Sequence, residues 1–331
     1  MRPKVTVISL GGTIAMTSAG EGGVTPTLEG ADLLAVPGLE DVAALSAVSF
    51  RQLPSAQLTL EDVIDLGGEI NRWIDEGANG IVVTQGTDTL EEVAFALDLL
   101  LDRDTSVVLT GAMRNPTLPG ADGPANLLAA VQVAASPQAR GLGTLVVFND
   151  EVHAARYVQK THTTSPATFR SPLTGPLGWV VEGRVRILNR PTRRPRILLA
   201  QGTLSTIVPM ALLTVSLGDD GRLIDLVQQA GYGGLVVEAF GAGHVPVPVA
   251  DKLKELTTVM PVVLASRTGS GEMLRHTYGF RGSERDIMAG GLIGAGYLDG
   301  PKARILLSLL LSSGADREQV AAAFAEWSGD S

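Results

Sequence analysis

Three short polar segments hold the side chains of this sequence that could do chemistry, and they are Gly11–Ala15, Gly86–Glu92 and Val158–Thr164. The chain has no cysteine and four histidines, so covalent catalysis falls to serine, threonine, lysine or a carboxylate. The patterns of a serine nucleophile elbow and of a phosphate-binding P-loop are both missing. The hydroxyl, amine and carboxylate groups of the three segments are therefore the first candidates.

Each candidate side chain has a catalytic interpretation and a purely structural one. Thr13 follows two glycines after the apolar run Val5–Leu10, so its hydroxyl is either a nucleophile or a helix N-cap. Thr87 could relay a proton, and Asp88 could bind a ligand ammonium or only stabilise the start of a helix. Lys160 is either a base, if partly buried, or a solvated loop residue. The residue types alone leave these alternatives open.

The elements that must position these residues read as strands alternating with amphipathic helices. Continuous apolar strands of this kind indicate a parallel sheet covered on both faces, and such sheets bind ligands at the carboxyl ends of their strands. The expected strands are Val5–Leu10, Ile81–Thr84, Ser106–Thr110 and Thr144–Phe148, and the expected helices are Thr59–Asp75, Glu91–Asp102 and Ala125–Ala135.

The second half of the chain predicts a separate α/β unit. Trp179–Leu188 reads as a hairpin around Glu182-Gly183, and a polar, proline-containing stretch follows it. We therefore expect an N-terminal domain at 1–190, a linker at 191–195 and a C-terminal domain at 196–331. The strands expected in the latter are Arg196–Ala200, Gly234–Glu238 and Pro261–Ser266, and the helices are Arg222–Gln229, Lys252–Thr258, Pro301–Ser312 and Asp316–Trp327.

Composition excludes several classes of function. The 331 residues carry a net charge of −9, which disfavours binding to nucleic acid or to an anionic membrane. No apolar run reaches 18 residues, so no membrane span is expected and the expected location is the cytoplasm. Without cysteines and with no H-E-x-x-H pattern, no metal site is predicted.

Taken in order along the chain, the motifs resemble those of the bacterial-type L-asparaginases and glutaminase-asparaginases, the threonine-dependent L-asparagine amidohydrolases. The resemblance covers nearly the whole chain. It implies a larger N-terminal parallel-sheet α/β domain with a C-terminal hairpin, and a smaller flavodoxin-like or Rossmann-like α/β domain. The motifs are Gly11–Ala15, Gly86–Glu92, Gly111–Arg114, Ala121–Pro124 with Asn126, Lys160-Thr161 with Ala167–Phe169, and Lys302–Arg304.

The resemblance implies hydrolysis of L-asparagine to L-aspartate and ammonia, with L-glutamine as a side substrate. Thr13 would attack the side-chain amide and form an acyl-enzyme, while Thr87, Asp88 and Lys160 handle the proton. No cofactor is implied. A homo-oligomer, a dimer or tetramer, is implied, with Glu284 reaching into a neighbour's site. The implied substrate-binding residues are Gly12, Ser55, Gly86, Thr87, Asp88, Ala112, His244 and Glu284.

Three positions depart from the family pattern. The family carries a tyrosine on a lid after the first motif, but Thr17–Thr27 contains none, which leaves open what activates Thr13. Gln85 stands where many relatives have histidine, and His244 where many have asparagine. Two alternatives therefore stay open: a non-catalytic amino-acid sensor, and the ammonia-releasing component of a tRNA-dependent amidotransferase. The extra N-terminal domain of the amidotransferase relative argues against that alternative, and the presence of Thr13, Thr87, Asp88 and Lys160 together argues against the sensor.

Overall fold

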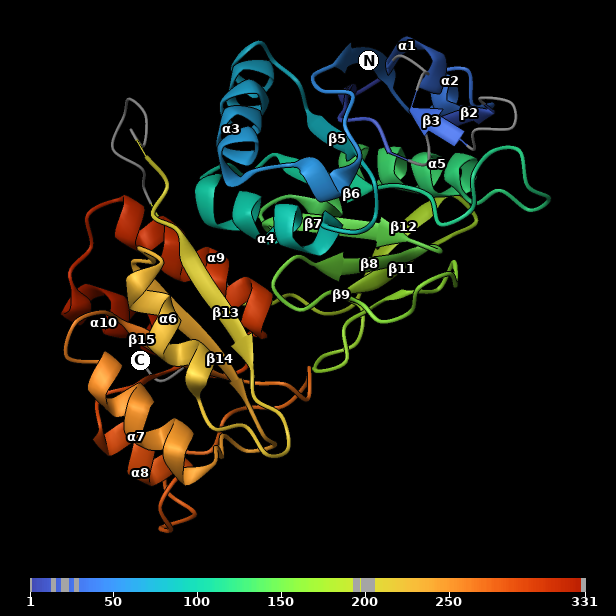
Figure 1. The fold of residues 1–331 in the computed structure, drawn as a ribbon. Helices are drawn as coiled ribbons and strands as arrows, with labels where there is room; N and C mark the ends of the chain where they lie inside the picture. Colours follow the sequence, from blue (N-terminus) through green and yellow to red (C-terminus); the bar gives the residue numbers. More distant parts are fainter. Residues whose placement is uncertain are drawn as a thin grey trace. The chain divides into compact units, whose positions relative to one another are not determined.

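Two compact units, Met1–Arg196 and Ile197–Ser331, make up the chain (Figure 1). The computed structural model describes residues 2–12, 16–18, 24–26, 30–192, 197 and 206–328. Each unit has its own sheet and its own hydrophobic core. No helix among these residues has the length and apolar character needed to span a membrane.

The N-terminal unit is built on an eight-stranded sheet in the order β12-β11-β8-β7-β6-β5-β1-β4. The five strands β4, β1, β5, β6 and β7 run parallel to one another. β8, β11 and β12 continue the sheet with antiparallel pairing. The strands are β1 Lys4–Ser9, β4 Ala44–Ser49, β5 Gly80–Thr84, β6 Ser106–Thr110, β7 Thr144–Phe148, β8 Glu151–Ala154, β11 Gly178–Val181 and β12 Arg184–Ile187. Two-stranded ribbons pair β2 Met16–Ser18 with β3 Val24–Pro26 and β9 Gln159–Lys160 with β10 Phe169–Arg170.

Helices cover both faces of this sheet. α5 packs with α2 on one face, over Val82 and Val108, while α3 and α4 contact the other face. β5, β6 and β7 are neighbours in the sheet in the same order as in the sequence, and α4 and α5, which connect them, lie on opposite faces. The β5–α4–β6 and β6–α5–β7 connections therefore have opposite hands. One of them departs from the usual right-handed form. The helices are α1 Gly30–Leu33, α2 Leu39–Val42, η3 Ser55–Gln57, α3 Leu60–Asp75, α4 Leu90–Leu100, α5 Gly123–Ala135 and η4 Pro137–Ala139.

Local sequence signals explain two of these elements. Thr59 caps α3 by accepting the Asp62 N–H, and the Asp62 side chain accepts the Thr59 N–H in return. This reciprocal pair of hydrogen bonds is a capping box, and the helix expected from Thr59 to Asp75 is confirmed. The hairpin β11–β12 turns through Glu182 and Gly183, whose φ angles of 51° and 72° match the left-handed turn that its twist requires.

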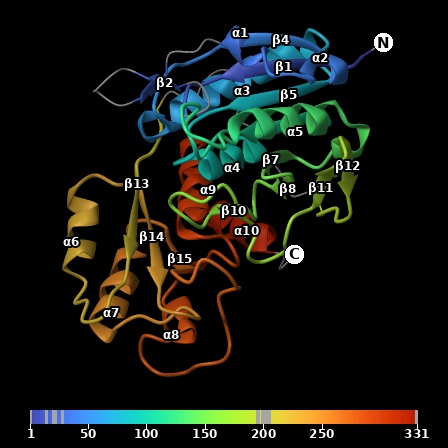
Figure 2. The ribbon, with the colours of Figure 1, turned by 90° about the vertical axis from the view of Figure 1, so that its right-hand side faces the viewer.

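The C-terminal unit is a four-stranded parallel sheet in the order β13-β14-β15-β16 (Figure 2). α9 packs on one face, and α6 and α7 share the core of the other. The predicted fold class, two α/β units of unequal size, is confirmed. The elements are β13 Met210–Thr214, α6 Arg222–Gln229, β14 Gly234–Ala239, α7 Val247–Leu256, β15 Val262–Ser266, α8 Glu284–Ala289, β16 Ile293–Gly294, α9 Gly300–Ser312 and α10 Arg317–Ser328.

Some expected elements differ from the observed ones. β13, which pairs with β14, was not predicted, and the expected strand Arg196–Ala200 lies, apart from Ile197, outside the described residues. α7 begins at Val247 rather than at Lys252, because Pro248 fits the first helical turn, where its missing N–H has no helical partner to lose.

Candidate active site

The site begins where three neighbouring strands end in glycine-containing turns. β1 lies beside β5, and β5 beside β6, so Gly12, Gly86 and Gly111 follow strands that end at one edge. A β-carbon on Gly12 would lie 2.1 Å from the backbone nitrogen of Gly86, and one on Gly111 would lie 2.5 Å from the carbonyl oxygen of Gln85. Only glycine permits this backbone contact, which brings the three turns into one layer.

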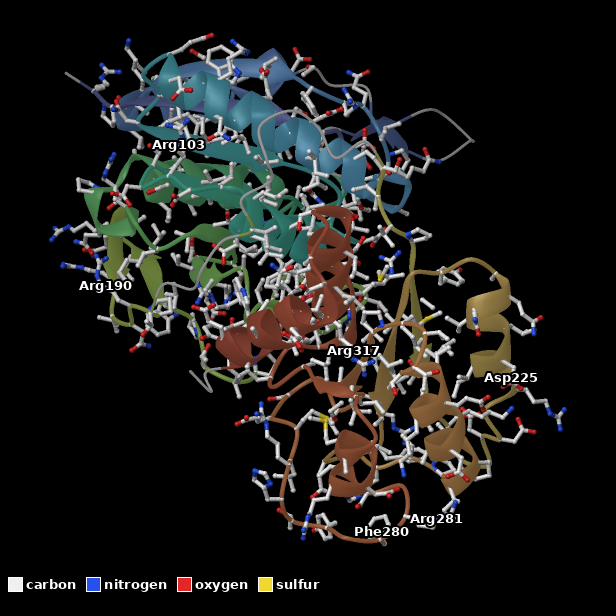
Figure 3. All side chains as sticks on the ribbon, turned by 90° about the vertical axis from the view of Figure 1, so that its left-hand side faces the viewer. Arg103, Arg190, Asp225, Phe280, Arg281 and Arg317 are labelled. Atoms are coloured by element: carbon white, nitrogen blue, oxygen red, sulfur yellow. The ribbon has the colours of Figure 1, made fainter. Side chains whose placement is uncertain are left out.

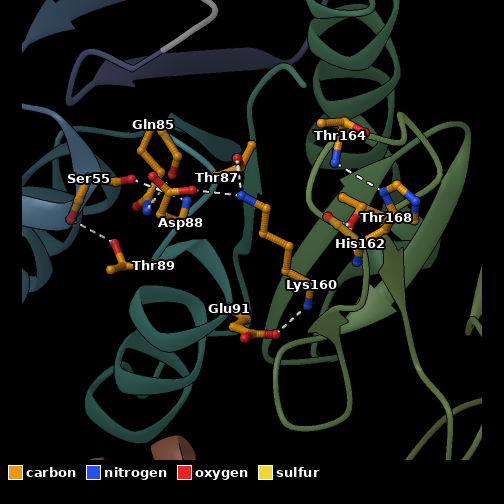
Figure 4. Close-up of polar contacts among 11 residues, drawn as sticks. Ser55, Gln85, Thr87, Asp88, Thr89, Glu91, Lys160, His162, Thr164 and Thr168 are labelled. Carbon is orange, nitrogen blue, oxygen red and sulfur yellow. Dashed lines mark hydrogen bonds and ion pairs between the residues drawn. The ribbon is translucent and has the colours of Figure 1, made fainter. Parts of the chain in front are cut away.

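Ser55 joins this layer to the segment that holds Asp88. The buried Ser55 hydroxyl accepts the Asp88 N–H at 3.2 Å, and the Thr89 hydroxyl donates to the Ser55 carbonyl at 2.9 Å (Figure 4). A β-carbon on Gly86 would lie 2.6 Å from Ser55 Oγ, so this glycine is needed for the close approach. The predicted residues Ser55, Gly86 and Asp88 are therefore brought together.

Lys160 reaches this segment from the β9–β10 hairpin. Its Nζ donates to Thr87 Oγ1 at 2.9 Å and to Asp88 Oδ1 at 2.7 Å (Figure 4). The lysine side chain is 17% exposed, but the Asp88 side chain is 68% exposed. The hydroxyl, amine and carboxylate named from the sequence thus form one hydrogen-bonded cluster, with Asp88 on its solvent side.

Glu91 has a role that the sequence analysis did not assign. Its Oε2 accepts the backbone N–H of Lys160 at 2.6 Å, which fixes the β9 backbone to the first turn of α4. Thr87, Asp88 and Glu91 therefore lie on one segment that contacts both ends of Lys160. The spacing of Glu91 after Asp88 was visible in the sequence, but its distance of 69 residues from Lys160 gave no signal.

Ala112 lies in a turn that two polar side chains organise, the half-buried Asp122 and the buried Asn126. Asp122 accepts the N–H groups of Met113 and Arg114, and Asn126 donates to the Gly111 carbonyl at 3.0 Å. The backbone N–H groups of Thr87 and Ala112 donate to no acceptor within the described part of the chain. Gln85 is fully buried, and its Nε2 donates to the Gly86 carbonyl at 3.2 Å.

His244 and Glu284 lie together in the C-terminal unit. Glu284 is fully buried and its Oε1 accepts the N–H groups of Thr277 and Tyr278 at 2.8 and 2.6 Å. His244 Nε2 lies 3.3 Å from Glu284 Oε2. The His244 ring packs edge-on against the rings of Tyr278 and Phe280. Of these two aromatic residues, Figure 3 labels Phe280. Whether Glu284 reaches into a neighbouring subunit stays a prediction, but its carboxylate already serves its own loop.

The pKa of Glu284 reflects these contacts. Burial by itself would raise the pKa of this carboxyl group. The backbone hydrogen bonds from Tyr278, Glu284 and Thr277, together with His244, outweigh burial and hold the pKa below its usual value. Glu284 is therefore an anion that the loop requires.

Thr13 falls outside the described residues, while Gly12, which precedes it, is buried against the backbone of Gly86. In the residues that the structure covers, no three histidine or acidic side chains gather as a metal site would require.

The fold and the motifs place the chain in one family of α/β amidohydrolases. Residues 4–193 match the family described as "Asparaginase, N-terminal", and residues 210–324 match the "Glutaminase/Asparaginase C-terminal domain". The chain therefore belongs to the asparaginase family.

Individual relatives agree over nearly the full length. The chain is 37% identical over 329 residues to a probable L-asparaginase of Deinococcus radiodurans, covering 98% of each chain. It is 33% identical over 316 residues to an L-asparaginase of Bacillus licheniformis, covering 95% of this chain and 97% of the other. The crystal structure of a probable cytoplasmic L-asparaginase from Campylobacter jejuni matches with a TM-score of 0.88 and 31% identity, covering 98% of this chain and all 100% of that one.

Proposed function

We propose that this protein is an L-asparaginase, which hydrolyses L-asparagine to L-aspartate and ammonia. The observation that carries the proposal is the Thr87–Lys160–Asp88 cluster at the strand ends of a chain of this family. The relatives reported above are named L-asparaginase, and none of them is named a sensor or an amidotransferase component. Pure binding of an amino acid would need Asp88 and Ser55 but not the hydroxyl–amine pair of Thr87 and Lys160.

Thr13 is the nucleophile in this proposal. Its Oγ1 attacks the side-chain amide carbon, its proton passes to the amide nitrogen through the Thr87–Lys160 pair, and ammonia leaves as the carbon–nitrogen bond breaks. Water then adds to the acyl-threonine ester and releases aspartate. The arrangement supports this route because Lys160 donates to Thr87 Oγ1, which leaves the Thr87 hydroxyl proton to point elsewhere.

Substrate recognition follows from the same cluster. Asp88 uses Oδ1 for Lys160, so we assign its Oδ2 to the substrate α-ammonium, a charge-assisted contact. Ser55 binds the α-carboxylate, and the N–H groups of Thr87 and Ala112 hold the developing oxyanion. His244 is assigned to the choice between asparagine and glutamine.

The assembly is also a proposal. The domains are 1–190 and 196–331, joined by a linker at 191–195, and the second completes the site of another subunit in a homo-oligomer. A cytoplasmic location is supported by the name of the Campylobacter jejuni protein. The reaction proposed uses no cofactor.

The test is ammonia release from L-asparagine and from L-glutamine by the intact chain and by Thr13→Ala. We expect turnover that Thr13→Ala abolishes. The control Thr174→Ala, at an exposed position whose hydroxyl donates to the Gly175 carbonyl, should retain it. The ratio of the two substrates then gives the preference. An intact chain that binds aspartate without releasing ammonia would contradict the proposal and favour the sensor.

A further inference from the structure

The turn that closes the β9–β10 hairpin is organised by one imidazole. His162 Nδ1 accepts the backbone N–H of Thr164 at 3.0 Å (Figure 4). It also accepts the backbone N–H of Ser165 at 3.1 Å. Neither the motif comparison nor the proposed reaction uses this side chain. The turn therefore depends on a titratable group that has no assigned role.

The two contacts define the protonation state of the ring. A ring nitrogen that accepts two N–H groups carries no proton, so His162 is neutral with its proton on Nε2. A second proton on the ring would turn Nδ1 into a donor that faces two other donors. Protonation of His162 therefore removes both hydrogen bonds at once.

The same turn is tied across its base by Thr168. The Thr161 N–H and hydroxyl both donate to the Thr168 carbonyl, at 2.9 and 2.8 Å, and the His162 N–H donates to Thr168 Oγ1 at 2.8 Å. Thr168 is fully buried, and Phe169 beside it packs on Phe148 with ring centroids 4.5 Å apart. One side of the hairpin is thus fixed to the core.

Lys160 lies on the other side of the hairpin, directly before the turn. It pairs with Phe169 across the two strands, and its backbone N–H is held by Glu91. The position of its Nζ relative to Thr87 therefore depends on how the turn between Lys160 and Phe169 closes.

We propose that His162 is a positioning residue for Lys160: by accepting the Thr164 and Ser165 N–H groups, its neutral ring holds the hairpin in the form that brings Lys160 to Thr87 and Asp88. The inference rests on the proposed function. It adds that removal of the imidazole acceptor lowers turnover by displacing Lys160 from Thr87.

The charged groups on the β9 and β10 strands are Lys160 and Arg170, and those from Asp88 through the first turn of α4 are Asp88, Glu91 and Glu92. None of them forms an ion pair with the His162 ring, and in the described residues no carboxylate lies within 4.0 Å of it. No salt bridge of the protonated ring would therefore replace the two lost hydrogen bonds.

Two substitutions separate the hydrogen bonds from the bulk of the side chain. His162→Asn keeps an acceptor in reach of the same two N–H groups, since asparagine caps the backbone two and three residues on, and its amide takes no proton in the working pH range. His162→Leu keeps the volume and removes the acceptor. His276→Asn, at an exposed position of the C-terminal unit, is the matched control.

We expect His162→Leu to lower kcat about 10- to 100-fold with a smaller change in KM, because a displaced Lys160 fails in proton transfer rather than in binding. We expect His162→Asn and the control His276→Asn to keep kcat within about threefold, since neither removes the acceptor of the two N–H groups. Equal activity in the Leu variant, or an Asn variant as poor as the Leu variant, would overturn the proposal.

Amide hydrogen exchange at Thr164 and Ser165 provides a readout that needs no turnover. These two N–H groups should exchange faster in His162→Leu than in the wild type at the same pH, but not in His162→Asn. If the wild type releases no ammonia, the proposed function fails while exchange still tests the turn. Unchanged exchange in an active protein would contradict the His162 proposal alone.

Discussion

The two units carry similar polar clusters that differ in how their charges are used. At the strand ends of the N-terminal sheet, Asp88 and Lys160 pair across 72 residues of sequence, and the Asp88 side chain stays 68% exposed. In the C-terminal unit, Glu284 is fully buried and its Oε1 accepts two N–H groups of the loop just before it. The first cluster keeps a charged oxygen available to a ligand, but the second uses its charge to hold its own backbone.

This contrast shows that a parallel α/β sheet does not by itself decide which of its polar residues do chemistry. Both units have the same layered architecture, and both place acidic side chains in their loops. The difference lies in the partners: side chains from a distant segment in one case, and neighbouring backbone in the other. Function has to be argued from such partners rather than from the fold.

The largest expected effect is on catalysis by the N-terminal cluster. Lys160→Met should lower kcat by about 10³-fold, since general acid–base groups contribute about 10²- to 10⁴-fold, while aspartate binding stays measurable. Steady-state ammonia release and calorimetric binding measure the two. Lys252→Met, which removes a C-terminal lysine paired with Asp225, should leave kcat unchanged. Equal kcat losses in both variants would remove the distinction between the units.

The second expected effect is a difference between the units in how the free energy of unfolding depends on pH. Burial, together with the charge of Arg170, lowers the pKa of His153 in β8 to about 4. An unfolded histidine titrates near pH 6.5. The unfolded chain therefore binds the extra proton first, and the free energy of unfolding of the N-terminal unit falls as the pH drops from about 6.5 to about 4, by up to about 3 kcal/mol.

His153→Asn should flatten this pH dependence, as followed by urea unfolding at several pH values with hydrogen-exchange mass spectrometry to resolve the units. The C-terminal unit behaves differently, because its buried group is a carboxyl, and the pKa of Glu284 is lowered from the ordinary glutamate value. Its contribution to stability is present above the ordinary glutamate pKa and is lost only as the pH falls through the lower folded value. A C-terminal unit that weakens first would reverse the comparison.

The third prediction concerns the buried carboxylate. Glu284→Gln should destabilise the C-terminal unit by about 1–3 kcal/mol, because two N–H groups lose a charged acceptor. Unfolding in urea checks this, and Glu255→Gln at an exposed position is the control. If Glu284→Gln instead loses activity while its stability is unchanged, and the loss occurs only in the oligomer, then Glu284 serves a neighbouring subunit. That result would contradict the contrast drawn between the two units.

The smallest expected effects are at the helix caps. Thr59→Ala removes the cap of α3 in the N-terminal unit and should cost about 1 kcal/mol. Ser283→Ala in the C-terminal unit should cost more, because the buried Ser283 hydroxyl also donates to the Tyr278 carbonyl at 2.7 Å. Thermal unfolding compares the two, with Thr59→Ser as the conservative control. A smaller loss of stability in Ser283→Ala than in Thr59→Ala would indicate that the Glu284 loop is less tightly organised than its contacts suggest.

Local signals were sufficient for much of the fold. The capping box at Thr59 and the turn at Glu182-Gly183 are set by residues next to one another, so the sequence predicts them directly. β13 was missed because Met210–Thr214 is rich in alanine and leucine, which favour helices, and only pairing with β14 makes it a strand.

The candidate site was predictable in composition but not in contacts. The family resemblance grouped Thr87, Asp88 and Lys160, whereas their spacing alone left a solvated loop lysine as the usual interpretation of Lys160. The contact of Glu91 with the Lys160 backbone and the orientation of the His162 ring depend on tertiary packing and on a side-chain rotamer. No periodicity or motif encodes either of them.

The glycine contacts of the strand-end turns limit how such an enzyme can change over evolution. Gly12 and Gly111 lack room for a β-carbon beside neighbouring backbone, so substitution there disrupts the turns before it can alter selectivity, and a β-carbon on Gly86 would displace the Ser55 hydroxyl. Variation in substrate preference must then accumulate at side chains around that backbone layer. Directed evolution of this chain would gain most by randomising positions such as Gln85 and leaving the three glycines untouched.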